Sequence, residues 1–427
     1  MPTDDIRITD LGAPELTEMQ KAAIAATPEV ELSVAAVLGA ARQMTGLDDF
    51  GPEDFTERLQ IWLDSIASDD GLNGLGRAGL FGDCVRLAAS RAKLQSALTR
   101  HPEISDIKID RPVIVAGLPR SGTTHLVNML AADKRFNSMP LWETMDPVLA
   151  PSAEAENFAH PQDDPRYKSC IEMWGQFEAL LPHMPAMHEM APDHVHEDVE
   201  LQGVDFSGYV LEWVSRPYGW RDYYLAHDRT PHYAYARQLI QYLTWRRGPA
   251  RWVMKSPPHM ENLAPLKQVY PDAKVIITHR DPVAVLQSAI TMIAYGDRIR
   301  RQKIDLPALA EYWISRLEIM LKQCVADRDL WTADNSLDVL FHDYMAHQPD
   351  ILAQVYELAE MDMTEAARAQ ITAYMAANPR GKHGQVSYHL IEDFGIDINA
   401  LRDRFGFYYE RFAVQCEPVK GERSGER

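Results

Sequence analysis

The chain has 427 residues, 46% of them hydrophobic, so it is long enough to bury a large core. Its formal net charge is −19 and its basic residues are dispersed, which argues against a protein whose main ligand is nucleic acid. Because the four cysteines lack metal-binding spacing, and no stretch forms a secretion leader or reaches the roughly 20 apolar residues of a membrane span, we expect a cytoplasmic protein without a membrane span or zinc ribbon.

Helical periodicity dominates the first hundred residues. Apolar residues recur at steps of three and four through 31–105, and such stripes are typical of helix packing. The following region alternates short β-branched runs with helical segments, as α/β domains do. We therefore predict a helical N-terminal extension over 1–105 and an α/β domain over 106–427, with a long helical and loop insertion at about 150–250.

The segment from Arg111 to Asp133 combines a strand, a glycine-bearing turn and the start of a helix. The run VIV leads into GLPRSGTT, and HLVNMLAA then has the composition and spacing of a helix. Backbone N–H groups and the positive end of a helix dipole converge on an anion in this arrangement. The sequence therefore predicts a phosphate site.

This turn matches the loop of nucleoside triphosphatases only in part. In the pattern G-x-x-x-x-G-K-[ST], the matching residues are Gly117, Gly122 and Thr124. Thr123 replaces the lysine that acts on the β- and γ-phosphates, and Arg120 supplies a positive charge within the loop. The missing lysine argues against triphosphate hydrolysis.

Two later stretches could form the acceptor side of a site. Glu143 lies in a segment bounded by prolines, which we expect to form a loop or short turn at the mouth of the same cleft. A histidine-rich section follows, and its spacing matches no metal template, so we predict a lid or acceptor wall and no metal site. Its histidines are His183, His188, His194 and His196.

Residues 251–292 have the order strand, helix, strand, helix. Lys255 stands at the end of the first predicted strand, and Arg280 follows the second, before a typical helix cap at Asp281 and Pro282. This order implies parallel pairing and places both cations at the carboxyl edge of a sheet, where open α/β sheets bind ligands. We expect Lys255 and Arg280 to face the phosphate loop.

A basic, glycine-flanked turn near the C-terminus is a second predicted anion site, with an exposed loop as the alternative. Its residues are Arg380, Gly381, Lys382, His383 and Gly384.

Two separated motifs together resemble those of sulfotransferases that use 3′-phosphoadenosine 5′-phosphosulfate (PAPS). The pair Arg280 and Ser288 is similar to the family's 3′-phosphate motif, and the late basic turn is similar to a turn that contacts the same phosphate. Arg120 with a downstream Glu143 resembles the bacterial and tyrosylprotein branch. The stretch that resembles the 5′-phosphosulfate loop consists of Pro119, Arg120, Ser121, Gly122, Thr123 and Thr124.

The resemblance implies an α/β, P-loop-like three-layer fold with a central parallel sheet flanked by helices. It also implies an enzyme that transfers a sulfuryl group from PAPS to the hydroxyl or amine of a small-molecule acceptor, with 3′-phosphoadenosine 5′-phosphate (PAP) released. By that analogy, Arg120 and Lys255 stabilise the leaving phosphate, and Glu143 is the base, with a histidine as the alternative. The resemblance assigns the 3′-phosphate to Arg280, Ser288, Arg380, Gly381 and Lys382.

Two other functions remain open at this point. The loop alone is compatible with a P-loop kinase or NTPase, and the whole scaffold with a non-catalytic nucleotide-binding protein. The sequence identifies neither the acceptor nor the oligomeric state.

Overall fold

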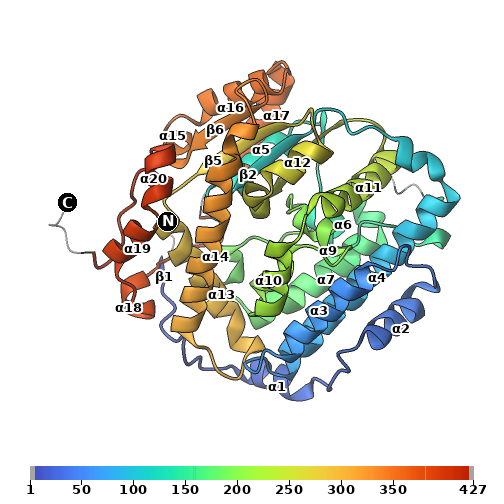
Figure 1. The fold of residues 1–427 in the computed structure, drawn as a ribbon, viewed down its shortest axis with the longest axis horizontal. Helices are drawn as coiled ribbons and strands as arrows, with labels where there is room; N and C mark the ends of the chain where they lie inside the picture. The colour runs from blue at the N-terminus through green and yellow to red at the C-terminus, as the bar shows by residue number, and fades with distance from the viewer. Residues whose placement is uncertain (1–4, 157, 159, 380, 423–427) are drawn as a thin grey trace.

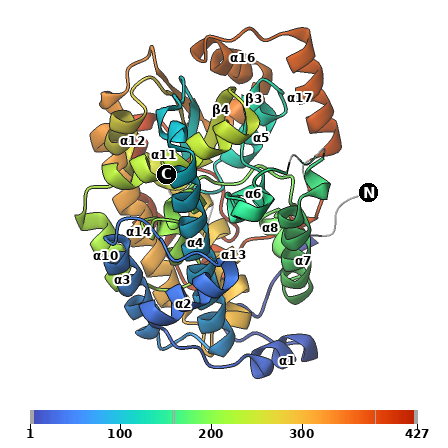
Figure 2. The same cartoon turned by 90° about the vertical axis from the view of Figure 1, so that its right-hand side faces the viewer.

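The computed structural model describes residues 5–156, 158, 160–379 and 381–422. Its centre is a five-stranded sheet in the order β3-β4-β2-β5-β6, in which every pairing is parallel. Figure 1 labels β2, β5 and β6, and Figure 2 labels β3 and β4. The predicted parallel sheet is therefore confirmed. Its strands are β2 Val113–Gly117, β3 Phe136–Asn137, β4 Arg251–Ser256, β5 Lys274–His279 and β6 Ser336–Leu340.

Helices cover both faces of the sheet, so its strands are buried on both sides. On β2, Ile114 and Ala116 contribute to a large core, whereas Val113 and Val115 contribute to a smaller core on the opposite face. The smaller core is covered by α5 Thr123–Ala131, α15 Phe341–Ala346, α16 Gln348–Leu358 and α17 Glu365–Ala377. The result is the three-layer arrangement expected from the sequence.

The large core is covered by helices from both halves of the chain. They are α2 Val34–Thr45, α3 Phe55–Ala67, α4 Gly74–Arg100, α8 Met184–Met187, α9 Val199–Gly203, α10 Tyr218–Ala226, α11 Thr230–Arg247, α12 Leu263–Val269, α13 Pro282–Arg300, α14 Leu306–Asp327, α18 Leu390–Phe394, α19 Ile398–Arg404 and α20 Gly406–Phe412. The remaining helices are α1 Glu18–Ala26, α6 Leu141–Met145 and α7 Pro165–Leu180.

The predicted helical N-terminal extension is confirmed, and it shares its core with the rest of the chain. Helix α4 packs against α13 and α11. Figure 2 shows α2, α3 and α4 in the same group of helices as α14. The division into domains at residue 105 stays a prediction. Among the described residues, no helix is both long and apolar enough to cross a membrane.

A two-stranded parallel sheet joins regions that are distant in sequence. Strand β1, Asp5–Ile6, pairs with β7, Gln385–Val386. In Figure 1 β1 lies beside α18 and α19. The Arg7 guanidinium adds hydrogen bonds of 2.8 and 2.6 Å to Asp393.

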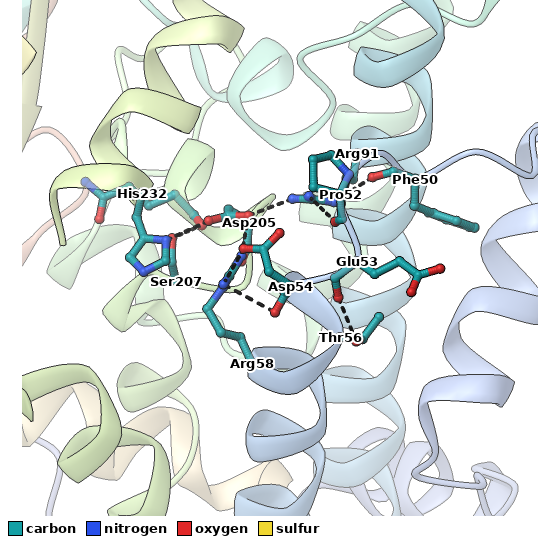
Figure 3. Close-up of polar contacts among 11 residues, drawn as sticks. Phe50, Pro52, Glu53, Asp54, Thr56, Arg58, Arg91, Asp205, Ser207 and His232 are labelled. Atoms are coloured by element: carbon teal, nitrogen blue, oxygen red, sulfur yellow. Dashed lines mark hydrogen bonds and ion pairs between the residues drawn. The ribbon is translucent and has the colours of Figure 1, made fainter. Parts of the chain in front are cut away.

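A buried ion cluster fastens the helical extension to the middle of the chain (Figure 3). The Asp205 carboxylate accepts hydrogen bonds of 2.7 Å from Arg58 on α3, Arg91 on α4 and His232 on α11. Although burial opposes its ionisation, the His232 hydrogen bond and the two guanidinium charges hold the pKa of Asp205 below its ordinary value. Three helices are therefore tied to one carboxylate.

Candidate functional site

The phosphate loop connects β2 to α5 through a tightly packed turn. A Cβ added to Gly117 would lie 1.9 Å from Thr278 Oγ1, so this position requires glycine. Ser121 Oγ lies 2.6 Å from the carbonyl oxygen of Leu118, to which it donates, and 2.7 Å from Thr278 Oγ1. The Ser121 hydroxyl thus holds the loop against β5.

The start of α5 is shaped to receive an anion. Gly122 occupies the N-cap position with a φ of 85° and offers no side-chain acceptor to the first N–H groups of the helix. Arg120 also has a positive φ, of 66°, which is unusual for a residue other than glycine. Unsatisfied N–H groups and the helix dipole together favour a bound phosphate or sulfate.

Lys255 stands directly beside this helix start. Its register partner on β2 is Val115, so its side chain leaves the sheet close to the loop. The Nζ atom lies 3.2 Å from Thr124 Oγ1 and 2.6 Å from Glu197 Oε1, and the residue is only 2% exposed. A buried cation therefore connects the phosphate loop to a carboxylate.

Arg120, Arg280 and Ser288 are brought together on the other side of the loop. Arg120 Nε donates to Ser288 Oγ at 3.0 Å, and Arg280 donates to the carbonyl oxygen of Arg120. Two further donors of Arg280 bind the Glu417 carboxylate at 2.6 and 2.7 Å, and its guanidinium stacks 4.0 Å over the Phe341 ring. Arg280 is thus fixed in place at the carboxyl end of β5.

These elements open onto one large cavity of about 1120 Å³. Its polar end is lined by the phosphate loop and by Arg280, and its wall continues along α13 as far as Arg300. The members of the predicted 5′-phosphosulfate loop that line it are Pro119, Arg120, Gly122, Thr123 and Thr124. Ser121, Ser288 and Lys255 lie behind that surface.

The end of the histidine-rich section forms part of the cavity wall. Asn128 on α5 clamps Val195 through hydrogen bonds of 3.0 and 3.2 Å, which presents His196 and Glu197 beside the phosphate loop. His188 and His196 both line the cavity. This is where the sequence placed a lid or acceptor wall.

Burial and nearby cations keep these histidines neutral near neutral pH. Burial, followed by the charges of Lys255 and Arg120, lowers the pKa of His188 to about 3. Burial also lowers the pKa of His196 well below its ordinary value and that of His194 to about 4. A neutral imidazole can accept or donate a hydrogen bond without adding positive charge.

Glu143 occupies a different position from Glu197. It lies on the short helix α6, is 5% exposed and forms an ion pair with Arg247 at the end of α11. Burial lowers the pKa of Arg247 to about 10. Glu143 is not among the residues that line the cavity, whereas Glu197 is. The role of Glu143 as base stays a prediction.

The basic C-terminal turn lies close to the cavity rim. Asn378 and Pro379, which precede it, line the cavity, and Gly381 has a φ of 77°. Lys382 Nζ lies 3.5 Å from Glu189 Oε1. Arg380 lies outside the described residues.

Sequence reasoning missed the partners that complete the site. Glu197 appears in the sequence as one acidic residue of the histidine-rich section, and it pairs with Lys255 in a segment held by Asn128 and by the backbone of Lys255. Glu417 follows Arg280 by 137 residues, and no local pattern connects the two. Across the described part of the chain, no cluster of three or more His, Cys, Asp or Glu residues is arranged to hold a metal ion.

Comparison with known proteins agrees with this geometry. A model of the Sulfotransferase family matches residues 112–365. The solved structure of the sulfotransferase STF1 from Mycobacterium tuberculosis H37Rv is similar with a TM-score of 0.76 and 26% identity, over 88% of this chain and 98% of that one. The sulfotransferase STF9 from Mycobacterium avium shares the fold, with a TM-score of 0.79 and 22% identity over 92% and 99% of the two chains. A search of curated proteins gave no significant match.

Proposed function

Because this chain belongs to the sulfotransferase family, we propose that its donor is PAPS and that it transfers the sulfuryl group to a hydroxyl or amine of a small molecule. The family implies a sulfonate donor. The observation that carries the choice of PAPS is the convergence of three cations, Arg120, Lys255 and Arg280, on the uncapped start of α5. Arg120, Lys255 and the helix dipole together suit a 5′-phosphosulfate group. The third cation, Arg280, suits a second phosphate.

The donor is proposed to bind across the loop. The N–H groups of Thr123 and Thr124 would hold the 5′-phosphate, with Pro119 and Gly122 shaping the seat and Ser121 fixing the loop to β5. Arg280 and the glycine turn at Gly381 would contact the 3′-phosphate. Ser288, which accepts from Arg120, would fix the orientation of that guanidinium.

The proposed reaction is an in-line displacement at sulfur. The acceptor oxygen or nitrogen forms a bond to sulfur while the bond from sulfur to the 5′-phosphate oxygen breaks, and negative charge moves to that oxygen. Lys255, which contacts Thr124 beside the loop, and Arg120 within the loop would stabilise this charge. The acceptor proton must pass to a base within hydrogen-bond reach.

Two glutamates are candidates for that base. Glu143 is the residue that the family resemblance indicates, but its carboxylate is engaged by Arg247. Glu197 faces the cavity, and its Oε1 lies 2.6 Å from Lys255 Nζ. We favour Glu197, because it combines access to an acceptor with contact to a cation of the donor site.

Ligand-dependent thermal stability tests the donor assignment. A ligand that binds only the folded state raises stability by RT ln(1 + [L]/Kd), so PAP should raise the melting temperature more than AMP does at equal concentration. ATP with magnesium is the control for a kinase. Stabilisation by ATP with magnesium and none by PAP would overturn the proposal.

A further inference from the structure

The cavity is larger than one ligand needs. Pockets for small molecules usually have volumes of roughly 300–1,000 Å³. The volume here is about 1120 Å³, and the phosphate loop lines only one end of it. The space beyond the loop is therefore available to a second molecule, the acceptor.

That second space is mainly apolar. Its walls come from α3, α4, α7, α13 and the segment around 210–214, and few of their cavity-facing side chains are charged. Examples are Trp62, Leu80, Phe177, Leu211, Met292 and Ile293. Apolar walls favour an apolar ligand body, because binding removes that surface from water on both partners.

The cavity is also long. Arg280 lines it just before α13 begins, and Arg300 lines it where α13 ends. Helix α13 has 19 residues, so at a rise of 1.5 Å per residue its ends are about 27 Å apart. An acceptor with its reactive group beside Glu197 would therefore extend away from the donor along this helix.

We call this apolar part of the cavity, beyond the phosphate loop, the chamber. The guanidinium of Arg300 lies at its far end. Within the described ranges, the Arg300 guanidinium makes no ion pair or side-chain hydrogen bond, and it lies 5.7 Å from the centre of the Phe177 ring. The two acidic side chains that influence it are engaged elsewhere, Asp297 by Arg216 and Asp83 by Arg86. Burial lowers the pKa of Arg300, since the surroundings leave its charge incompletely compensated.

We propose that the acceptor is an elongated amphiphile, with a hydroxyl beside Glu197, an apolar body along α13 and an acidic group that pairs with Arg300. The inference rests on the proposed sulfotransferase reaction and specifies its acceptor class. A carboxylate or phosphate at that end would accept hydrogen bonds from the Arg300 guanidinium and compensate its charge. The apolar middle would displace water from the chamber.

Binding to the PAP-saturated full chain tests this proposal. The probes are ω-hydroxyhexadecanoate, hexadecanol, which lacks the acid, and ω-hydroxyhexanoate, which lacks the length. We expect ω-hydroxyhexadecanoate to bind roughly tenfold or more tightly than either, because a hydrogen-bonded charge pair adds about one to two powers of ten in affinity. Equilibrium dialysis measures all three.

Arg300 variants assign the acid-binding role. Arg300→Met should remove the preference for the acid over the alcohol, and Arg300→Lys should retain much of it. PAP affinity should stay unchanged in both variants, which shows that they are folded. An unchanged preference in Arg300→Met would overturn the assignment of Arg300.

A matched pair of glycine variants tests the chamber. Gly79 and Gly82 are both exposed on α4 with open space at the Cβ position, but only Gly79 lines the cavity. Gly79→Leu should weaken binding of the long hydroxy acid by about tenfold, since an occupied site resists added volume, and Gly82→Leu should not. Equal effects of the two substitutions would overturn the location of the chamber.

The outcomes separate the two proposals. Failure of PAP to bind would contradict the PAPS donor. PAP binding with no preference for the long hydroxy acid would leave the donor assignment standing and overturn the acceptor class.

Discussion

Buried charges form two kinds of arrangement in this molecule. Around Asp205, the cations Arg58, Arg91 and His232 meet their carboxylate entirely within the chain, and the cluster joins helices. At the carboxyl edge of the sheet, the half-buried Arg120 lines a cavity of about 1120 Å³. The buried Lys255 lies behind the cavity surface and contacts Glu197, which lines it. Similar side chains thus join helices in one region and lie at or behind a cavity wall in the other, where we propose that they bind the donor.

The two arrangements differ in whether the ion pair is enclosed by the protein or has a member that lines the cavity. The Glu143–Arg247 pair belongs with the Asp205 cluster, because both partners meet inside the protein. The Glu197–Lys255 pair belongs with the cavity, because its carboxylate lines the open space. Removing a member of the first kind should affect stability, and removing a member of the second kind should affect binding or turnover.

The largest expected effect comes from the two candidate bases. Glu197→Gln should lower turnover by about 10²- to 10⁴-fold with PAP affinity retained, because a positioned general base contributes rate in this range. Glu143→Gln is the matched control and should mainly lower the melting temperature. Steady-state kinetics with PAPS and thermal unfolding measure both. The reverse pattern would assign the role of base to Glu143 and would contradict the division between enclosed and cavity-lining pairs.

The next effect concerns the Asp205 cluster. Asp205→Asn should lower the free energy of unfolding by about 3–5 kcal/mol, since two buried guanidinium groups lose their charged partner. Urea denaturation measures the loss. PAP titration of the folded variant should give an unchanged Kd, and weaker PAP binding at unchanged stability would show that the cluster is not a fastening.

A smaller effect is expected at Arg280, which has features of both kinds. Its guanidinium is held by Glu417 and Phe341 yet lines the cavity. Arg280→Ala should weaken PAP binding by about 10- to 100-fold, because hydrogen bonds to charged groups contribute about 1.5–3 kcal/mol each. AMP, which lacks the 3′-phosphate, is the control and should lose much less. Equal losses for the two nucleotides would remove Arg280 from the 3′-phosphate site.

The smallest effect is a dependence of stability on pH. The folded pKa of His188, about 3, lies below its ordinary value of 6.5, so the unfolded chain binds more protons between these values. The stability contribution is complete above the unfolded pKa and is lost as pH falls. Between about pH 6.5 and 5, the wild type should lose roughly 1–2 kcal/mol more than His188→Gln does. If the free energy of unfolding fell equally with pH in the wild type and in His188→Gln, His188 would not be held neutral in the folded protein.

Much of the fold could be predicted because its signals are local. The short apolar run WVM before Lys255, the β-branched run VIIT before Arg280 and the cap at Asp281 predicted parallel strands and the sheet edge at which these cations lie. The glycines at 117 and 122 indicated the phosphate loop for the same reason, since strand, turn and helix follow one another directly.

The acceptor side could not be predicted in the same way. Glu197 meets Lys255 in a segment that Asn128 holds through Val195 and that also bonds to the Lys255 backbone, and Glu143 meets an arginine at the end of another helix. Each of these contacts joins segments with no common periodicity. A carboxylate in the sequence carries no sign of whether a guanidinium from a distant helix will neutralise it or a cavity will expose it.

The pairing of β1 with β7 has a consequence for how the enzyme is made. The Arg7–Asp393 contact spans 386 residues of sequence, and the strand that pairs with β1 begins directly after the basic turn at 381–384. Contacts over such separations form late, because closing the intervening chain costs entropy. During synthesis on the ribosome, the sheet and its phosphate loop can therefore assemble first, and the contact between β1 and β7 beside the basic turn forms only after residue 386 has emerged.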